Sequence, residues 1–111
     1  MDIQVQKDEH KAVLALAGKL DAVTAQDFDK AVGALIEGGT VRLILDCSRL
    51  DYLSSAGLRA LLMAAKRITA KGGQLRVAGM HGAAREVFEI SGFHTIFAMD
   101  DSVDAAVSAL G

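Results

Sequence analysis

Several ordinary features of a protein sequence are scarce in this chain, and each shortage excludes a class of protein. The chain has no proline or tryptophan, and its single cysteine, Cys47, excludes an internal disulfide framework. No apolar run approaches the roughly 20 residues that a membrane-spanning helix needs. Residues 1–13 are acidic and polar, where a signal peptide would be basic and then apolar. We therefore expect a cytoplasmic protein without direct membrane insertion.

Strong positive charge is also missing. The formal net charge is −2, and the lysines and arginines are spread along the chain instead of gathered in a stripe. A surface that binds nucleic acid needs clustered cations to neutralise phosphates. We therefore expect no nucleic acid among the partners.

The apolar content, by contrast, is sufficient for one core. Hydrophobic residues make up 51% of the 111-residue sequence, and this length is typical of a single domain. No linker, internal repeat or low-complexity tract divides the chain. Residues 1–111 are therefore expected to form one domain.

Hydrophobic periodicity predicts strands that alternate with helices in the order β-β-α-β-α-β-α-β-α. The expected strands are residues 3–6, 11–17 (closed by Gly18), 41–45, 75–78 and 96–97, and residues 46–53 are expected to form a loop. The expected helices begin after Thr24, after Leu53, near Ala84 and after Ser102, and Thr24 and Asp27 have the spacing of a capping box. This order is typical of an α/β fold. We expect a mixed, mostly parallel sheet of about four to five strands with about four helices.

Most catalytic patterns are absent. His10, His81 and His94 have no Cys, Asp or Glu at metal-ligand spacing, so no metal site is expected. Cys47 lacks the arginine that follows a phosphatase-type nucleophile, because position 53 is leucine, and a small buried residue at a strand end is the favoured interpretation. We therefore expect neither an enzyme nor a bound cofactor.

Two adjacent serines stand where a loop gives way to an amphipathic helix. Either Ser54 or Ser55 can be an N-cap, accepting a hydrogen bond from a backbone N–H two or three residues later. The same position suits a phosphate, because a helix N-terminus offers unpaired N–H groups and a positive dipole end. Gly57 costs about 1 kcal/mol of helix propensity relative to alanine. Its presence indicates either that something, such as a binding partner, approaches the backbone closely or that the helix packs tightly against a neighbour.

The helix after these serines has a second notable face. Ala56, Ala60 and Met63 lie opposite the expected core stripe, beside Arg59. Alanine is a good helix former, which is a sufficient reason for its presence. The alternative is a docking surface on which a partner helix approaches closely and methionine adapts to it. Tyr52, the only tyrosine, is expected at the rim of such an interface.

At these residues the sequence resembles the STAS domain, a family named for sulfate transporters and anti-sigma factor antagonists, and the resemblance covers essentially the whole chain. The residues that carry it are Gly18-Lys19-Leu20-Asp21 followed by Thr24-Ala25, Leu45-Asp46-x-Ser48, Ser54-Ser55-Ala56-Gly57-Leu58 and Val87-Phe88-x-x-Ser91-Gly92-Phe93.

The resemblance implies an anti-sigma factor antagonist. Such a protein binds an anti-sigma factor that is also a serine kinase and so releases the sigma factor. Phosphorylation of a serine dissociates the complex, and a PP2C-type phosphatase restores it. By position in the family motif, that serine is Ser55, and Asp21 and Asp46 match acidic family positions near the same surface.

One departure from the family pattern keeps alternatives open. Many kinase-regulated members have Asp just before the phosphorylated serine, and this chain has Ser54 there, so both Ser54 and Ser55 are candidates. A second hypothesis is a constitutive STAS subunit of a membrane ABC lipid-transport complex. A third is a small-molecule sensor or hydrolase that uses the carboxyl ends of the parallel strands.

Overall fold

A computed structural model describes residues 1–111 and contains one five-stranded sheet with four α-helices. The strands are β1 (Asp2–Lys7), β2 (Ala12–Leu20), β3 (Arg42–Leu53), β4 (Gln74–Ala78) and β5 (Ala98–Asp100). The helices are α1 (Ala25–Glu37), α2 (Ser55–Ala70), α3 (Gly82–Ile90) and α4 (Val103–Leu110), with a short 3-10 turn at Phe93–Thr95. The expected element order and mixed α/β class are confirmed.

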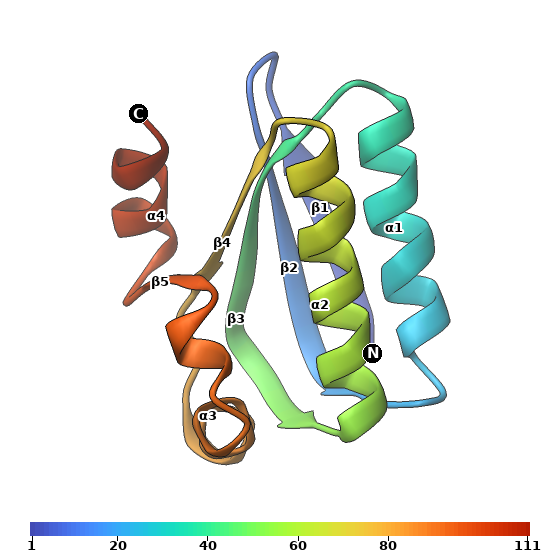
Figure 1. Ribbon diagram of the computed structural model, residues 1–111, viewed down its shortest axis with the longest axis vertical. Helices are drawn as coiled ribbons and strands as arrows, with labels where there is room; N and C mark the ends of the chain where they lie inside the picture. Colours follow the sequence, from blue (N-terminus) through green and yellow to red (C-terminus); the bar gives the residue numbers. More distant parts are fainter.

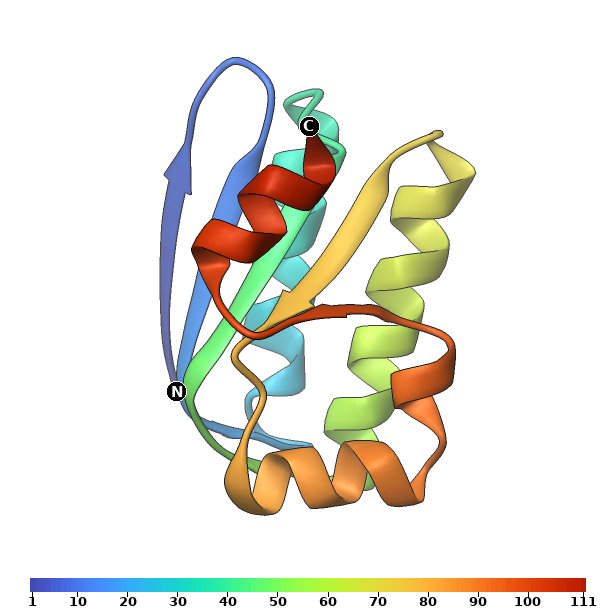
Figure 2. The same cartoon turned by 90° about the vertical axis from the view of Figure 1, so that its left-hand side faces the viewer.

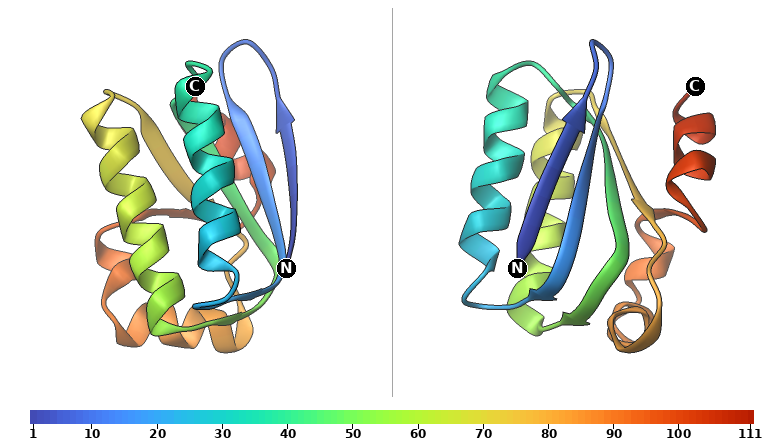
Figure 3. Two further views of the ribbon diagram at one scale, coloured as in Figure 1. Left: turned by 90° about the vertical axis from the view of Figure 1, so that its right-hand side faces the viewer. Right: turned by 180° about the vertical axis from the view of Figure 1, so that it is seen from behind.

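The strands lie in the sheet in their sequence order. β1 pairs antiparallel with β2, and β2, β3, β4 and β5 are parallel to one another. α1 and α2 lie side by side on one face, whereas α4 covers part of the other face (Figures 1 and 2). On that second face no helix lies over β1 (Figure 3, right), whereas Val13 of β2 packs against the cluster under α4.

Most of the core lies between the sheet and the α1–α2 layer. The main cluster has 20 buried residues, including Phe28 of α1 and Leu61 of α2, whereas the cluster under α4 has only four. The α1–α2 face therefore supplies most of the hydrophobic stabilisation, because that stabilisation scales with the apolar area removed from water. None of the helices combines the length and the apolarity that crossing a bilayer requires.

The largest difference from the sequence-based expectation is the length of β3. Residues 46–53 are not a loop, because β3 continues to Leu53 and its last residue is still paired with β2. Two register shifts interrupt the pairing, so that buried Cys47, Leu50 and Leu53 are each separated by two exposed residues. Such β-bulges insert an extra residue and break the period of two by which strands are recognised.

Three smaller expectations were also wrong. β2 does not end at Gly18, which adopts a φ of 104° inside the strand, but continues to Leu20. Thr24 and Asp27 form no capping box, because the Thr24 side chain makes no cap hydrogen bond. Residues 96–97 precede the last strand, which is Ala98–Asp100.

Candidate functional site

Ser54 is fully incorporated into the fold at the start of α2. Its N–H donates to the carbonyl of Leu20 at 3.0 Å, and its carbonyl accepts from the N–H of Leu58 at 2.8 Å. Its Oγ accepts the N–H of Gly57 at 3.2 Å, which makes Ser54 the N-cap of α2. These bonds give Ser54 a structural role, one that an aspartate at the same position could also perform.

Gly57 has a packing role in the first turn of α2. A Cβ atom at this position would lie 2.3 Å from the carbonyl oxygen of Leu20 and 2.9 Å from Leu53 Cδ1. No side chain fits in that space, so the first turn of α2 can rest directly on the end of β2 only because the residue is glycine. Gly57 is buried and, although it was expected to contact a partner, it presents no surface to one.

Ser55 differs from its neighbour because its side chain is free. It is exposed, it is the first residue of α2, and its hydroxyl makes no hydrogen bond. The first N–H groups of a helix have no intrahelical partner and carry a partial positive charge. The first turn of α2 contains no acidic residue that would offset this charge. The position therefore favours a negative group on the Ser55 hydroxyl.

A shallow groove runs between α1 and α2, and Ala56, the residue after Ser55, lines it. We call it the α1–α2 groove, and its lining residues are Ala22, Ala25, Gln26, Asp29, Ala56, Arg59, Ala60, Met63 and Arg67. Met63 is exposed and Ala60 packs partly against the core, so this face of α2 is a flank of the helix rather than the side opposite its core stripe. The groove unites Ala56, Arg59, Ala60 and Met63 as expected from the sequence.

Asp21 organises the turn that leads from β2 into α1. Its Oδ1 accepts the N–H groups of Val23 at 3.0 Å and Thr24 at 3.1 Å. The hydrogen bond from the Thr24 N–H is the main cause that lowers the pKa of the Asp21 carboxyl below its ordinary value. Asp21 follows Leu20, to which Ser54 is bonded, so this turn lies at the same end of the sheet as Ser55.

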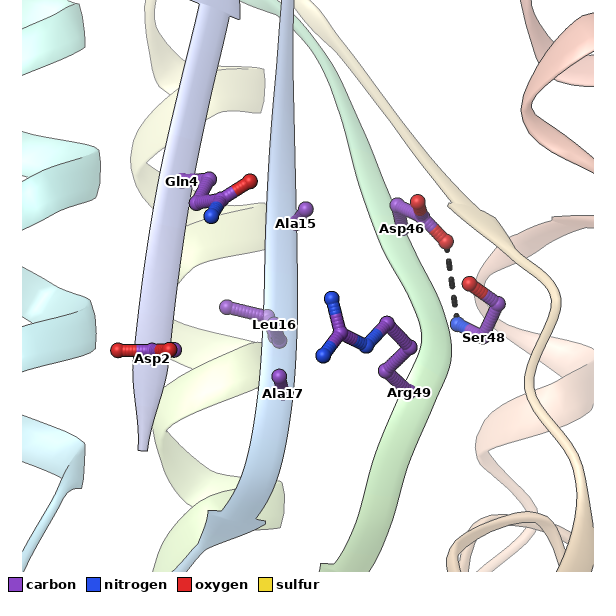
Figure 4. A pocket seen from close by; sticks show the side chains of 8 residues that line it. All are labelled: Asp2, Gln4, Ala15, Leu16, Ala17, Asp46, Ser48 and Arg49. Atoms are coloured by element: carbon purple, nitrogen blue, oxygen red, sulfur yellow. Dashed lines mark hydrogen bonds between the residues drawn. The ribbon is translucent and has the colours of Figure 1, made fainter.

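Asp46 lies on a different surface from the one expected. Ile44 packs under α4, and because successive side chains of a strand alternate between faces, Asp46 also faces that side. There it lines a hollow with Ala15 and Arg49 (Figure 4), and its Oδ1 accepts the N–H of Ser48 at 3.1 Å. Its partner on β2, Ala15, also lies five residues before Leu20, the partner of Leu53, which is about 17 Å at roughly 3.3 Å per residue. Asp46 therefore does not join the surface around Ser55.

The other singled-out residues have simpler environments. Tyr52 is exposed on the last part of β3, next to Lys19 of β2, and not in a loop. Cys47 is buried at the sheet, and burial raises the pKa of its thiol to about 12. A thiol with that pKa stays protonated at neutral pH, so Cys47 is not a nucleophile.

Sequence reasoning missed the α1 side of the groove. Ala25, Gln26 and Asp29 face α2, and Asp29 Oδ1 accepts a hydrogen bond from Arg67 Nη1 at 2.9 Å. Connections between neighbouring parallel strands are almost always right-handed. Two such connections in the same direction, β2–α1–β3 and β3–α2–β4, place their helices on one face, and this rule could have identified the missing residues.

The comparisons with known proteins agree with this architecture. The model of the STAS domain matches residues 2–106. A protein of Bordetella bronchiseptica, BtrV, described as a candidate anti-sigma factor antagonist, is 37% identical over 98% of this chain and 94% of its own length.

Solved structures have the same fold. An anti-sigma factor antagonist from Mycobacterium paratuberculosis has a TM-score of 0.87 and 25% identity, over 97% of this chain and 92% of the other. The Bacillus cell fate determinant SpoIIAA in its phosphorylated form has a TM-score of 0.78 and 20% identity, over 99% and 100% of the two chains. The sheet order, the family match and these likenesses lead to one conclusion: this chain belongs to the STAS domain family.

Proposed function

We propose that this chain is an anti-sigma factor antagonist whose activity is switched off by phosphorylation of Ser55. In this proposal it binds an anti-sigma factor that is also a serine kinase, through the α1–α2 groove and the start of α2. Binding releases the sigma factor. The kinase then phosphorylates Ser55, the complex dissociates, and a PP2C-type serine phosphatase returns the chain to its binding state.

The free hydroxyl of Ser55 carries this proposal. Ser54 uses its Oγ as the cap of α2, whereas the Ser55 hydroxyl is exposed and has no partner within the chain. A kinase can therefore reach Ser55 without breaking a hydrogen bond of the fold. This difference favours Ser55 over Ser54 as the phosphate acceptor.

The position of Ser55 gives the phosphate an effect on binding. A phosphoserine carries close to two negative charges at neutral pH. Ser55 immediately precedes Ala56, which lines the apolar α1–α2 groove. A charged group at this border disfavours the dehydration that an apolar contact requires, so a partner seated in the groove would be released.

The comparisons support the class of function. BtrV and the mycobacterial structure are both described as anti-sigma factor antagonists, and the phosphorylated form of SpoIIAA is an example of a modified protein with this fold. The buried, protonated Cys47 argues against a thiol enzyme, and the groove combines alanines and a methionine with four polar or charged residues, as a docking surface would.

A capture experiment tests the proposal. The tagged chain is used to purify partners from its native host, and the partners are identified by mass spectrometry. We expect an anti-sigma factor with a kinase domain. The variant Met63→Glu, which places a charge in the groove, should lose this partner, whereas Ile90→Glu, at a residue 87% exposed on α3, should keep it. Recovery of a membrane transporter's ATPase instead would favour the constitutive subunit of an ABC lipid-transport complex and contradict the proposal.

A further inference from the structure

Arg59 is the unpaired cation of the α1–α2 groove. Two arginines line the groove, and the other, Arg67, forms an ion pair with Asp29 at 2.9 Å. The Arg67 guanidinium also lies against Gly33 of α1, where a Cβ atom would be 3.0 Å from Nη2. Arg59 is exposed and takes part in none of the ion pairs of the chain. The charge of Arg59 is thus available to a binding partner.

Arg59 also lies one helical turn after Ser55. Residues at i and i+4 on an α-helix are neighbours on its surface, with Cβ atoms about 5–6 Å apart. Both side chains are exposed, and no acidic side chain lies in the first turn of α2 to compete for the guanidinium. An arginine forms charge-assisted, often bidentate hydrogen bonds with a phosphate. A negative group N-terminal to a cation is also the favourable order along a helix.

We propose that Arg59 is shared between two states of the switch. When Ser55 is unmodified, Arg59 pairs with a carboxylate on a partner helix whose small apolar side chains fill the α1–α2 groove. When Ser55 is phosphorylated, the phosphate pairs with Arg59 within α2 and removes this contact. The inference rests on the proposed function for the phosphate at Ser55, and it adds the chemistry of the partner and the means of release.

The charges around the groove indicate an acidic partner residue. Asp29 is neutralised by Arg67, Gln26 is uncharged, and the other lining residues besides Arg59 are alanines and Met63. Arg59 therefore leaves the groove with one uncompensated positive charge. A carboxylate on the docking helix complements this charge, whereas a basic residue there would be repelled.

The phosphate–arginine pair can be tested without any kinase or partner. The chain is produced with phosphoserine encoded at position 55, and the second pKa of the phosphate, ordinarily about 6, is measured by ³¹P NMR. Arg59 favours the dianion. We therefore expect the variant Arg59→Gln to raise this pKa by about 0.3 units or more at about 0.15 M ionic strength, where the Debye length is only about 8 Å. Lys66→Gln removes a charge that lies about 16 Å along the same helix from Ser55. Salt screens the interaction between Lys66 and the phosphate at that distance, so this variant should leave the phosphate pKa unchanged.

The ³¹P titrations of the wild type and the two variants can distinguish a phosphate–arginine pair from a general effect of charge. A higher phosphate pKa in Arg59→Gln alone supports the pair. The same pKa in the wild type and in Arg59→Gln overturns it, and equal shifts in Arg59→Gln and Lys66→Gln also overturn it, because they would reflect only the overall charge of the protein.

The partner's chemistry is tested with the anti-sigma factor captured from the native host. Arg59→Gln in the unphosphorylated chain should weaken its binding about five- to tenfold and reduce the salt dependence of binding, whereas Lys66→Gln should alter neither. If Arg59→Gln changed neither the affinity nor the salt dependence, the proposal that the partner supplies a carboxylate to Arg59 would be overturned. If no anti-sigma factor binds at all, the proposed function fails, and the ³¹P titration still decides the phosphate–arginine pair.

Discussion

The helices α2 and α4 both begin with a capping serine, but their first turns differ. Ser54 Oγ accepts the N–H of Gly57 at 3.2 Å, and Ser102 Oγ accepts the N–H of Ala105 at 3.1 Å. The first turn of α4 contains Asp104, whose charge suits a helix N-terminus. The first turn of α2 contains an exposed serine, no acid, and a glycine pressed against Leu20.

This difference shows how a helix start can be capped and still leave one exposed hydroxyl outside the hydrogen bonding. At α4 the cap and the acidic residue both serve the fold. At α2, Ser54 and Gly57 fix the backbone, and the hydroxyl of Ser55 is left out of the hydrogen bonding. No charged side chain of the first turn therefore offsets the positive end of the α2 dipole.

The largest expected effect is at the third residue of each helix. Gly57→Ala forces a Cβ atom into the space 2.3 Å from the Leu20 carbonyl, and we expect it to lower the free energy of unfolding by about 1–3 kcal/mol. Ala105→Gly at the matching position of α4 should cost about 1 kcal/mol or less, through helix propensity alone. Urea unfolding of both variants measures this. A Gly57→Ala variant as stable as the wild type would contradict the close packing of α2 on β2.

The two caps should have similar effects. Ser54→Ala and Ser102→Ala each remove one side-chain hydrogen bond to a backbone N–H, at a cost of about 1 kcal/mol. Equilibrium unfolding in urea compares them directly. If Ser54→Ala were neutral while Ser102→Ala destabilised the protein, Ser54 would not be a structural cap, and the division of roles between Ser54 and Ser55 would fail.

The turn at Asp21 adds a pH dependence to the α2 end of the sheet. The pKa of Asp21 is lowered in the folded chain, chiefly by the hydrogen bond from the Thr24 N–H. Its contribution to stability is therefore present above its ordinary pKa of about 3.9, and it is lost as the pH falls through the lower folded value. Asp21→Asn should lose less stability than the wild type on acidification below about pH 4. Acid titrations of the wild type and Asp21→Asn, followed by circular dichroism, measure this difference. If the two curves coincided, the contribution of Asp21 to the pH dependence would be refuted.

The smallest expected effect is that of a single charge in the first turn. Ser55→Asp should stabilise α2, and Asp104→Asn should destabilise α4, each by about 0.3–1 kcal/mol at low salt. Both differences should shrink in high salt, because the charges are exposed and therefore screened. Thermal unfolding at two salt concentrations is the measurement. A destabilising Ser55→Asp substitution would mean that the start of α2 does not favour negative charge.

Much of the fold could be predicted from the sequence because the helices and most strands keep a regular hydrophobic period. The end of β3 could not be predicted in this way. Two bulges place its buried residues, Cys47, Leu50 and Leu53, three positions apart, whereas a strand is recognised by a spacing of two. The start of α1 was also misread. Thr24 Oγ1 donates to the Lys19 carbonyl and accepts from the Asp21 N–H, so its partners precede the helix instead of lying within it.

The site could be predicted in part. Two serines before an amphipathic helix, and the alanine face of that helix, are local patterns, and the structure places them beside one groove. The orientation of Asp46 depends on the alternation of faces in β3 and on the position of α4, which no local motif contains. The α1 side of the groove depends on the topology of the sheet. Sequence patterns thus identified the helix but not its surroundings.

Phosphate mapping tests the central claim most directly. The wild type and the variants Ser54→Ala and Ser55→Ala are incubated with the captured anti-sigma factor kinase and ATP, and the products are mapped by mass spectrometry. We expect one phosphate at Ser55 in the wild type and in Ser54→Ala, and none in Ser55→Ala. A phosphate that persists in Ser55→Ala, or that is lost in a folded Ser54→Ala, would contradict the assignment of Ser55 as the switch residue.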